Sequence, residues 1–444
     1  MTRTDLLGIA VVLGIALAML AILGLWGRKL PDAEGMRKVA HLGTGVLALS
    51  FPWVFSSLEP VLVVCGLSVA VLVMVSAVPS VRSRLGSSLY SVDRSSRGEF
   101  YFPISVALLY WLSGGDRLLY MIPILILTFA DAVAAILGTI YGRVSYEGVG
   151  GKKSVEGSVA FFTVAFFAVH VPLLLFSHLG RGQTLLVALD IALVVTLLEA
   201  VAWRGLDNIF IPLGGFLLLH IYTAISVREL IYRFIAATVL VTGVLLYRSR
   251  TTLQASALIA SALALYASWG AGGWRWFVAP AILFACYSLF GPEDALQSVR
   301  RDSVYAVASV AAAGLFWLFL AKVNNLAYLI FPYTVAYTAH LAILGWTLGV
   351  LRDPSQKAWH RGPLVLIKSW LLIFVPYIWI EGATIVAVEH ALAALLFCCV
   401  TFTVFCMIEK RHHGLYADDG WRWLRQAGLV TLFTAPLVFQ WGPR

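Results

Sequence analysis

The chain has 444 residues, of which 60% are hydrophobic and only 12% are charged, and its net charge is +9. A soluble globular protein carries about a quarter charged residues, so this composition excludes a soluble protein and indicates one embedded in a bilayer. The positive charge does not indicate nucleic-acid binding, because the basic residues are spread over short loops. The five cysteines lie in apolar stretches without the paired spacing of a zinc site or a disulfide framework.

Long apolar segments separated by short polar loops predict an all-α, polytopic integral membrane helical bundle of about 14-16 transmembrane helices. The first segment, Leu6 to Trp26, is too long for the core of a signal peptide and is expected to be the first span. With an outside N-terminus and alternating spans, the loops on one side hold about 23 Lys and Arg, against about 8 on the other. This excess predicts a multi-pass protein of the cell inner membrane whose active site faces the cytoplasm.

Charged residues gather at span ends only in the first part of the chain, which predicts two domains. Residues 1-230 are expected to form a catalytic membrane domain. Residues 231-444 are expected to form a second, non-catalytic transmembrane domain that serves as a scaffold or a dimer surface, so an oligomer is possible. A second active site that uses His340, Glu381 or Glu389 remains an alternative, although a carboxylate near a span end can reach water and need do nothing.

A carboxylate lies inside one span, in the sequence FADAVAAILGTIYGR that starts at Phe129. Charged groups in membranes are costly, so Asp131 is a candidate functional residue. Small residues around it, including Gly138 and Gly142, allow neighbouring helices to approach closely. Asp131 precedes Arg143 by twelve residues, or roughly 18 Å of straight helix, which places its carboxylate near the middle of the membrane. A polar ligand from the cytoplasm could reach it only through a water-filled cleft or a break in the helix, and we expect one of these.

A glycine-rich loop with two lysines follows, and a new helix begins directly after it. Lys152 and Lys153 alone would be ordinary cytoplasmic basic residues. Together with the Gly-Gly pair before them and Ser154 at the start of the helix, they predict a phosphate-binding loop, because helix N-termini bind anions. Asp131 and Glu156 are then expected to hold a magnesium ion, since hard oxygen atoms are its preferred ligands.

The spacing of these residues resembles that of the phytol kinases, the dolichol kinases and the related phosphatidate cytidylyltransferases, which use CTP. The matching positions are Asp131, Ala134, Gly138, Gly142, Lys153, Ser154, Glu156 and Gly157. An early RKVAH sequence and a later in-span glutamate followed by GLDNIFIP resemble the kinase branch and supply Arg37, Lys38, His41, Glu199, Asp207 and Asn208. The signature that ends the cytidylyltransferases is absent, which favours a kinase.

The resemblance implies a membrane-embedded kinase that transfers the terminal phosphate of CTP to an isoprenoid alcohol such as phytol, geranylgeraniol, farnesol or a polyprenol, with Mg²⁺. It implies three sets of site residues. The catalytic set is Asp131, Glu199 and His41; the nucleotide-binding set is Arg37, Lys38, Lys152, Lys153, Ser154, Asp207 and Asn208; the metal ligands are Asp131, Glu156 and Asp207.

Three other functions remain open. They are a cytidylyltransferase that forms a CDP-lipid, a membrane transporter, for which intramembrane acids and two halves are typical, and a catalytically inactive scaffold. A transporter gives no reason for a Gly-Gly-Lys-Lys loop between adjacent spans. The segment from Arg248 to Phe284 resembles the membrane family that includes phytyl-phosphate kinases, over about forty residues.

Overall fold

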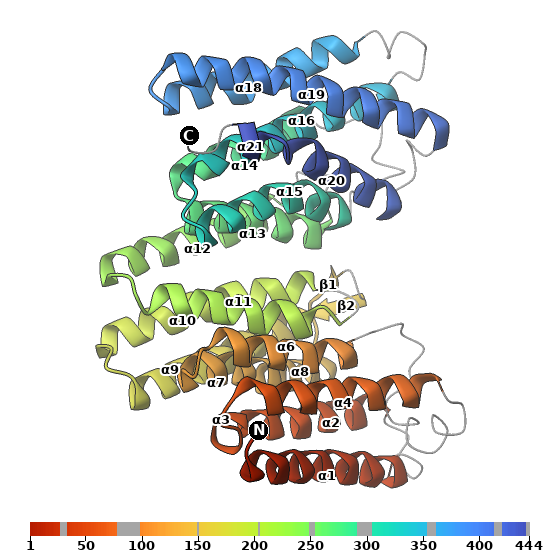
Figure 1. Ribbon diagram of the computed structural model, residues 1–444, viewed down its shortest axis with the longest axis vertical. Helices are drawn as coiled ribbons and strands as arrows, with labels where there is room; N and C mark the ends of the chain where they lie inside the picture. The colour runs from red at the N-terminus through yellow and green to blue at the C-terminus, as the bar shows by residue number, and fades with distance from the viewer. Residues whose placement is uncertain are drawn as a thin grey trace. The chain divides into compact units, whose positions relative to one another are not determined.

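Within the residues that it describes, the computed structural model is built of helices apart from one short β-hairpin (Figure 1). It describes residues 1–26, 33–77, 98–148, 151–202, 205–247, 254–290, 304–352, 361–412 and 420–440. The chain packs as two compact units, Met1–Ala237 and Thr238–Arg444, whereas the sequence placed the division after residue 230. Each unit therefore has its own internal packing and is described by itself.

The first unit contains the elements α1 to α11 and the beginning of α12. They are α1 (Arg3–Trp26), α2 (Ala33–Leu49), α3 (Phe51–Val54), α4 (Leu58–Ala77), α6 (Gly98–Leu112), α7 (Arg117–Leu125), the π-helical turn η1 (Ile126–Ala130), α8 (Asp131–Tyr141), β1 (Ser145–Gly148), β2 (Gly151–Ser154), α9 (Val155–Phe176), α10 (Arg181–Val201), α11 (Asp207–Tyr222) and α12 (Val227–Tyr247).

The second unit is helical throughout its described ranges. Its elements are α13 (Ala255–Gly272), α14 (Trp274–Phe290), α15 (Val304–Val323), the 3₁₀ turn η2 (Ala327–Leu329), α16 (Ile330–Arg352), α18 (Gly362–Ile380), α19 (Ile385–His412), α20 (Gly420–Thr434) and α21 (Leu437–Gln440). Helix α16 lies at the centre of the unit, because the apolar residues along its whole length belong to one large buried cluster.

Eleven helical segments in the described part of the chain are long and apolar enough to cross a membrane. This confirms the all-α polytopic membrane bundle. The number is smaller than the 14-16 spans expected, because several apolar segments form shorter helices. Helix α6, for example, has 15 residues and α11 has 16, and these helices reach roughly 23 Å, less than the hydrocarbon core of a bilayer.

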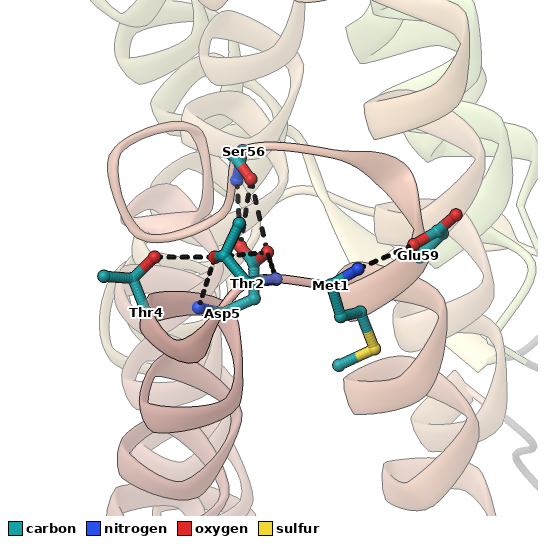
Figure 2. A network of polar contacts seen from close by, with 6 residues as sticks. All are labelled: Met1, Thr2, Thr4, Asp5, Ser56 and Glu59. Atoms are coloured by element: carbon teal, nitrogen blue, oxygen red, sulfur yellow. Dashed lines mark hydrogen bonds and ion pairs between the residues drawn. The ribbon is translucent and has the colours of Figure 1, made fainter.

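The first helix is closed at its N-terminus by a capping box (Figure 2). The Thr2 amide donates to Asp5 Oδ2 at 2.7 Å, and the Asp5 amide donates to Thr2 Oγ1 at 3.1 Å. Each side chain therefore accepts a hydrogen bond from the backbone amide of the other residue. The buried Asp5 carboxylate also accepts a hydrogen bond from Ser56 Oγ at 3.1 Å, before α4. This network joins the start of α1 to the turn between α3 and α4.

Helices α8 and α9 meet at glycines. A Cβ atom on Gly138 would lie 2.9 Å from Ser154 Oγ, and one on Gly157 would lie 3.1 Å from the carbonyl oxygen of Ala134. Ser154 is the N-cap of α9, and its hydroxyl accepts a hydrogen bond from the Gly157 amide at 3.1 Å. The small residues that the sequence assigned to close helix packing therefore hold the start of α9 against α8.

Candidate active site

Charged residues from separate elements gather at one end of the first unit. In Figure 1 this is the end of the helices at which β1 and β2 lie, and the N-terminus lies at the opposite end. The residues that meet are Lys38 and His41 from α2, Asp131 from α8, Lys153 from β2, Glu199 from α10 and Asp207 from α11. We call these six residues the charged cluster.

Asp131 is the first residue of α8 and is held by two residues of α2. Lys38 Nζ donates to Asp131 Oδ2 at 2.7 Å, and His41 Nε2 lies 3.7 Å from the same oxygen. Arg37 also acts on the Asp131 carboxylate electrostatically. The carboxylate in the span is therefore paired with the basic residues of the RKVAH segment, which lies about ninety residues earlier in the chain.

The helix that carries Asp131 is irregular directly before it. The π-helical turn Ile126–Ala130 ends at Asp131, and such turns are frequent at functional sites. His41 Nε2 lies 3.1 Å from the carbonyl oxygen of Leu127 in this turn. A carbonyl oxygen only accepts hydrogen bonds, so Nε2 carries the proton and, in neutral His41, Nδ1 has the lone pair. The irregular part of this helix therefore lies directly before Asp131.

Lys153 is anchored on the other side of the cluster by Glu199. Its Nζ atom donates to Glu199 Oε1 at 2.7 Å and also to the carbonyl oxygen of the same residue. Glu199 lies near the C-terminal end of α10, where the last carbonyl groups of a helix favour a cation. Lys153, which the sequence assigned to phosphate binding, is therefore paired with a carboxylate, as Lys38 is.

The predicted phosphate-binding loop is an antiparallel β-hairpin. In β1 and β2, Tyr146 is opposite Lys153, and Glu147 is opposite Lys152. Because successive side chains of a strand point to opposite faces, Lys153 faces the cluster while Lys152 is exposed on the other face. Gly151 has a φ of 134°, a conformation that favours glycine, and residues 149 and 150 lie outside the described ranges.

Asp207, at the start of α11, joins the two ion pairs into one electrostatic system. Asp131, Lys153, Lys38 and His41 all act on its carboxyl group. Glu199 in turn is affected by Asp131 and Asp207. The charges of the two ion pairs are thus coupled through Asp207, in agreement with the cost of isolated charges in a membrane.

Two predicted site residues are engaged in contacts outside the charged cluster. Asn208 Nδ2 donates to the carbonyl oxygen of Gly98 at 3.1 Å, and the Asn208 carbonyl accepts from Ser105, so this residue joins α11 to α6. Glu156 accepts a hydrogen bond from the Val144 amide at 3.2 Å, beside the hairpin. These contacts support structural tasks, and the nucleotide contact of Asn208 and the metal contact of Glu156 remain predictions.

The predicted magnesium ion can be compared with the acidic residues present. Within the described ranges, no three His, Cys, Asp or Glu side chains are close enough to hold a metal ion on their own. Protein-bound Mg²⁺ usually takes only one or two carboxylates together with phosphate oxygens of the substrate. Asp131 acts electrostatically on Asp207, so these two carboxylates are the ones that would hold a metal ion arriving with a nucleotide.

The two ion pairs of the charged cluster keep part of their side-chain surface exposed. Side-chain exposure is 12% for Lys38 and 17% for Asp131, and it is 24% for Lys153 and 16% for Glu199. Charges sealed inside apolar surroundings would show almost none, so both ion pairs are partly open.

Asp190 is a buried acidic residue that the sequence analysis did not single out. Asp190 lies in the middle of α10 without exposed surface; neither of its carboxyl oxygens has a hydrogen-bond partner, and Arg233 of α12 acts on it electrostatically. An acid inside a long apolar stretch was the signal in the sequence that could have identified Asp190.

The residues of the alternative second active site do not form one cluster. In the second unit, Nδ1 of the buried His340 lies 3.0 Å from Gln426 Nε2, and within the described ranges no hydrogen bond joins this histidine to Glu381 or Glu389.

No protein-family model matches the chain, and no solved structure matches it. Among curated proteins the chain is similar to the phytol kinase of Synechocystis sp.. The two sequences are 33% identical over 192 residues, which are 43% of this chain and 80% of the relative. Since the similarity extends over most of the relative's length, the chain belongs to the phytol kinase family.

Proposed function

We propose that the protein is a kinase that transfers the terminal phosphate of CTP, with Mg²⁺, to the hydroxyl group of an isoprenoid alcohol at the cytoplasmic face of the cell inner membrane. The observation that carries this proposal is the charged cluster, in which Lys38 and Lys153 lie beside Asp131, Glu199 and Asp207. Phosphoryl transfer mainly requires positioning and charge stabilisation, which lysines and a metal-binding pair of carboxylates supply. The name of the phytol kinase relative supports an isoprenoid alcohol as the acceptor.

The reaction assigns each part of the cluster a task. Lys38 and Lys153 bind phosphate oxygens, and Mg²⁺ held by Asp131 and Asp207 would neutralise part of the triphosphate charge. The alcohol oxygen attacks the terminal phosphorus, the bond from that phosphorus to the bridging oxygen breaks, and CDP leaves. The hydroxyl proton passes to a nearby base, for which the carboxylate of Glu199 is available once Lys153 has moved to a phosphate.

The membrane explains how such a substrate is presented. The hydrocarbon chain of an isoprenoid alcohol stays among the apolar spans, while its hydroxyl group reaches the end of the helices where the cluster lies. The eleven apolar helices of membrane-spanning length in the described ranges are consistent with this arrangement. The same chemistry fits phytol, farnesol, geranylgeraniol and longer polyprenols, and a panel of alcohols distinguishes them.

The test uses purified protein in liposomes, CTP labelled on either the terminal or the α phosphate, and that panel of alcohols. Terminal label should enter the lipid phase as a monophosphate while CDP appears. Transfer of the α label with release of pyrophosphate would instead identify a cytidylyltransferase. If neither label reaches a lipid and the alcohol is carried across the bilayer, the protein is a transporter and the kinase assignment fails.

A further inference from the structure

Tyr146 is a residue of the hairpin to which the proposed reaction gives no task. It lies in β1 directly opposite Lys153, so the two side chains share the face of the hairpin that meets the charged cluster. Its hydroxyl oxygen lies 2.8 Å from Ser158 Oγ, in the first turns of α9. The inward face of the hairpin is therefore attached to α9 through Tyr146 and to α10 through Lys153.

These two attachments differ in what happens to them when a nucleotide binds. Lys153 must leave Glu199 for a phosphate oxygen, so its own ion pair stops holding the hairpin. The contact between Tyr146 and Ser158 involves no group that the phosphate requires and can persist. The base of the hairpin is held separately, because the Val155 amide donates to the carbonyl oxygen of Val144 at 2.9 Å.

We propose that Tyr146 is a positioning residue for the nucleotide: it holds the hairpin against α9, so that Lys153 stays beside the cluster while its ammonium group moves from Glu199 to a phosphate oxygen. This inference rests on the proposed function. It assigns Tyr146 an effect on nucleotide affinity and none on the chemical step, since the residue acts through Lys153.

The electrostatic setting of Tyr146 agrees with this role. Burial, and after it the nearby Glu199 carboxylate, raise the pKa of the Tyr146 phenol to about 12, although the Ser158 contact opposes the shift. The phenol is therefore uncharged at neutral pH and adds no negative charge that would repel phosphate. Its hydroxyl group remains able to exchange a hydrogen bond with Ser158.

The test compares two tyrosines that differ in this contact. Tyr146→Phe removes the hydroxyl group and keeps the ring, and Tyr141→Phe makes the same change on a residue that is 62% exposed at the end of α8. Loss of one neutral hydrogen bond should raise the KM for CTP about five-fold and leave kcat within about two-fold. Tyr141→Phe should match the wild type in both constants.

A second readout follows Lys153 directly in the nucleotide-free protein. An amine-reactive reagent, quantified by mass spectrometry, should label Lys153 about five times faster in Tyr146→Phe than in the wild type, with the exposed Lys152 as the internal reference. Ser158→Ala removes the other half of the contact, together with the hydrogen bond from Ser158 Oγ to the carbonyl oxygen of Ser154, and should give the same change in labelling. The double variant should be no worse than Ser158→Ala alone, because the contact between Tyr146 and Ser158 is already lost in that variant.

The outcomes separate this inference from the proposed function. If Tyr146→Phe and Ser158→Ala label Lys153 at the wild-type rate, or if kcat falls while the KM for CTP is unchanged, Tyr146 is not a positioning residue. If the wild type transfers no phosphate but the labelling changes as expected, the placement of Lys153 stands and the kinase assignment fails. Should Tyr146→Phe not fold, Ser158→Ala decides alone.

Discussion

Replacing Asp131 by Asn should change the site in two opposite ways. Asn keeps the size and polarity of the side chain but removes the charge that a metal ion requires, so turnover with CTP and Mg²⁺ should fall at least about a hundred-fold. The same change releases Lys38, whose Nζ atom donates to Asp131 Oδ2 at 2.7 Å. Metal-free CTP should therefore bind more tightly to this variant than to the wild type.

The size of the second effect follows from the ion pair. A hydrogen bond to a charged group contributes about 1.5–3 kcal/mol, or about ten- to hundred-fold in affinity. Because the side chains of Lys38 and Asp131 keep 12% and 17% of their surface exposed, solvent weakens the pair, and we expect a gain near the lower end, about ten-fold. Titration calorimetry with CTP in EDTA measures it, and the same titration with Mg²⁺ should show the variant losing the advantage.

Asp116→Asn is the matched control. Asp116 is the N-cap of α7 and accepts hydrogen bonds from the amides of Leu118 and Leu119, a task that Asn performs as well. This control should leave both turnover and metal-free binding at wild-type values. Equal binding of metal-free CTP by Asp131→Asn and the wild type would show that Lys38 does not bind phosphate, and retained turnover would make Asp131 a structural residue.

Three further changes test the site and its support. Lys153→Ala should weaken CTP binding about ten- to hundred-fold, while Lys152→Ala, on the exposed face of the hairpin, should change it little in the same calorimetric titration. Gly142→Ala should lower the free energy of unfolding in mixed micelles by about 1–3 kcal/mol, because its Cβ would overlap the carbonyl oxygen of Gly138 and lie 2.9 Å from the Cβ of Ser154. Gly66→Ala, with nothing within 4 Å, is the control, and equal stability of the two variants would exclude a packing role for Gly142. Asp5→Ala should destabilise the fold by about 0.5–2 kcal/mol in that assay without changing the KM for CTP, and a changed KM would contradict this separation.

The sequence predicted those features that depend on the cost of charge in a membrane. Asp131 was singled out because an isolated charge is costly in a bilayer, and its carboxylate is indeed paired with a basic residue, Lys38. Membership of the phytol kinase family is also confirmed, while a relation to the dolichol kinases and the cytidylyltransferases remains a prediction.

Other features depend on distances that one-dimensional patterns do not contain. The pairing of Lys38 with Asp131 joins residues 93 positions apart, and either lysine could have met either acid. Asn208 stood in a motif next to Asp207, yet its amide group is used against α6, because neighbouring residues of a helix point in different directions. Short polar segments with glycines have no clear period, so the hairpin was expected only as a loop.

The two lysine–carboxylate pairs have a consequence for a protein surrounded by phospholipid. Lipid headgroups present phosphate at high local concentration beside any basic group at the membrane surface. A headgroup phosphate that took Lys38 or Lys153 would leave Asp131 or Glu199 as an uncompensated anion, since it brings no divalent cation to replace the lysine. In the proposed reaction, a triphosphate that arrives with a metal ion would replace both partners at once, so the paired lysines would favour the nucleotide over the lipid headgroups.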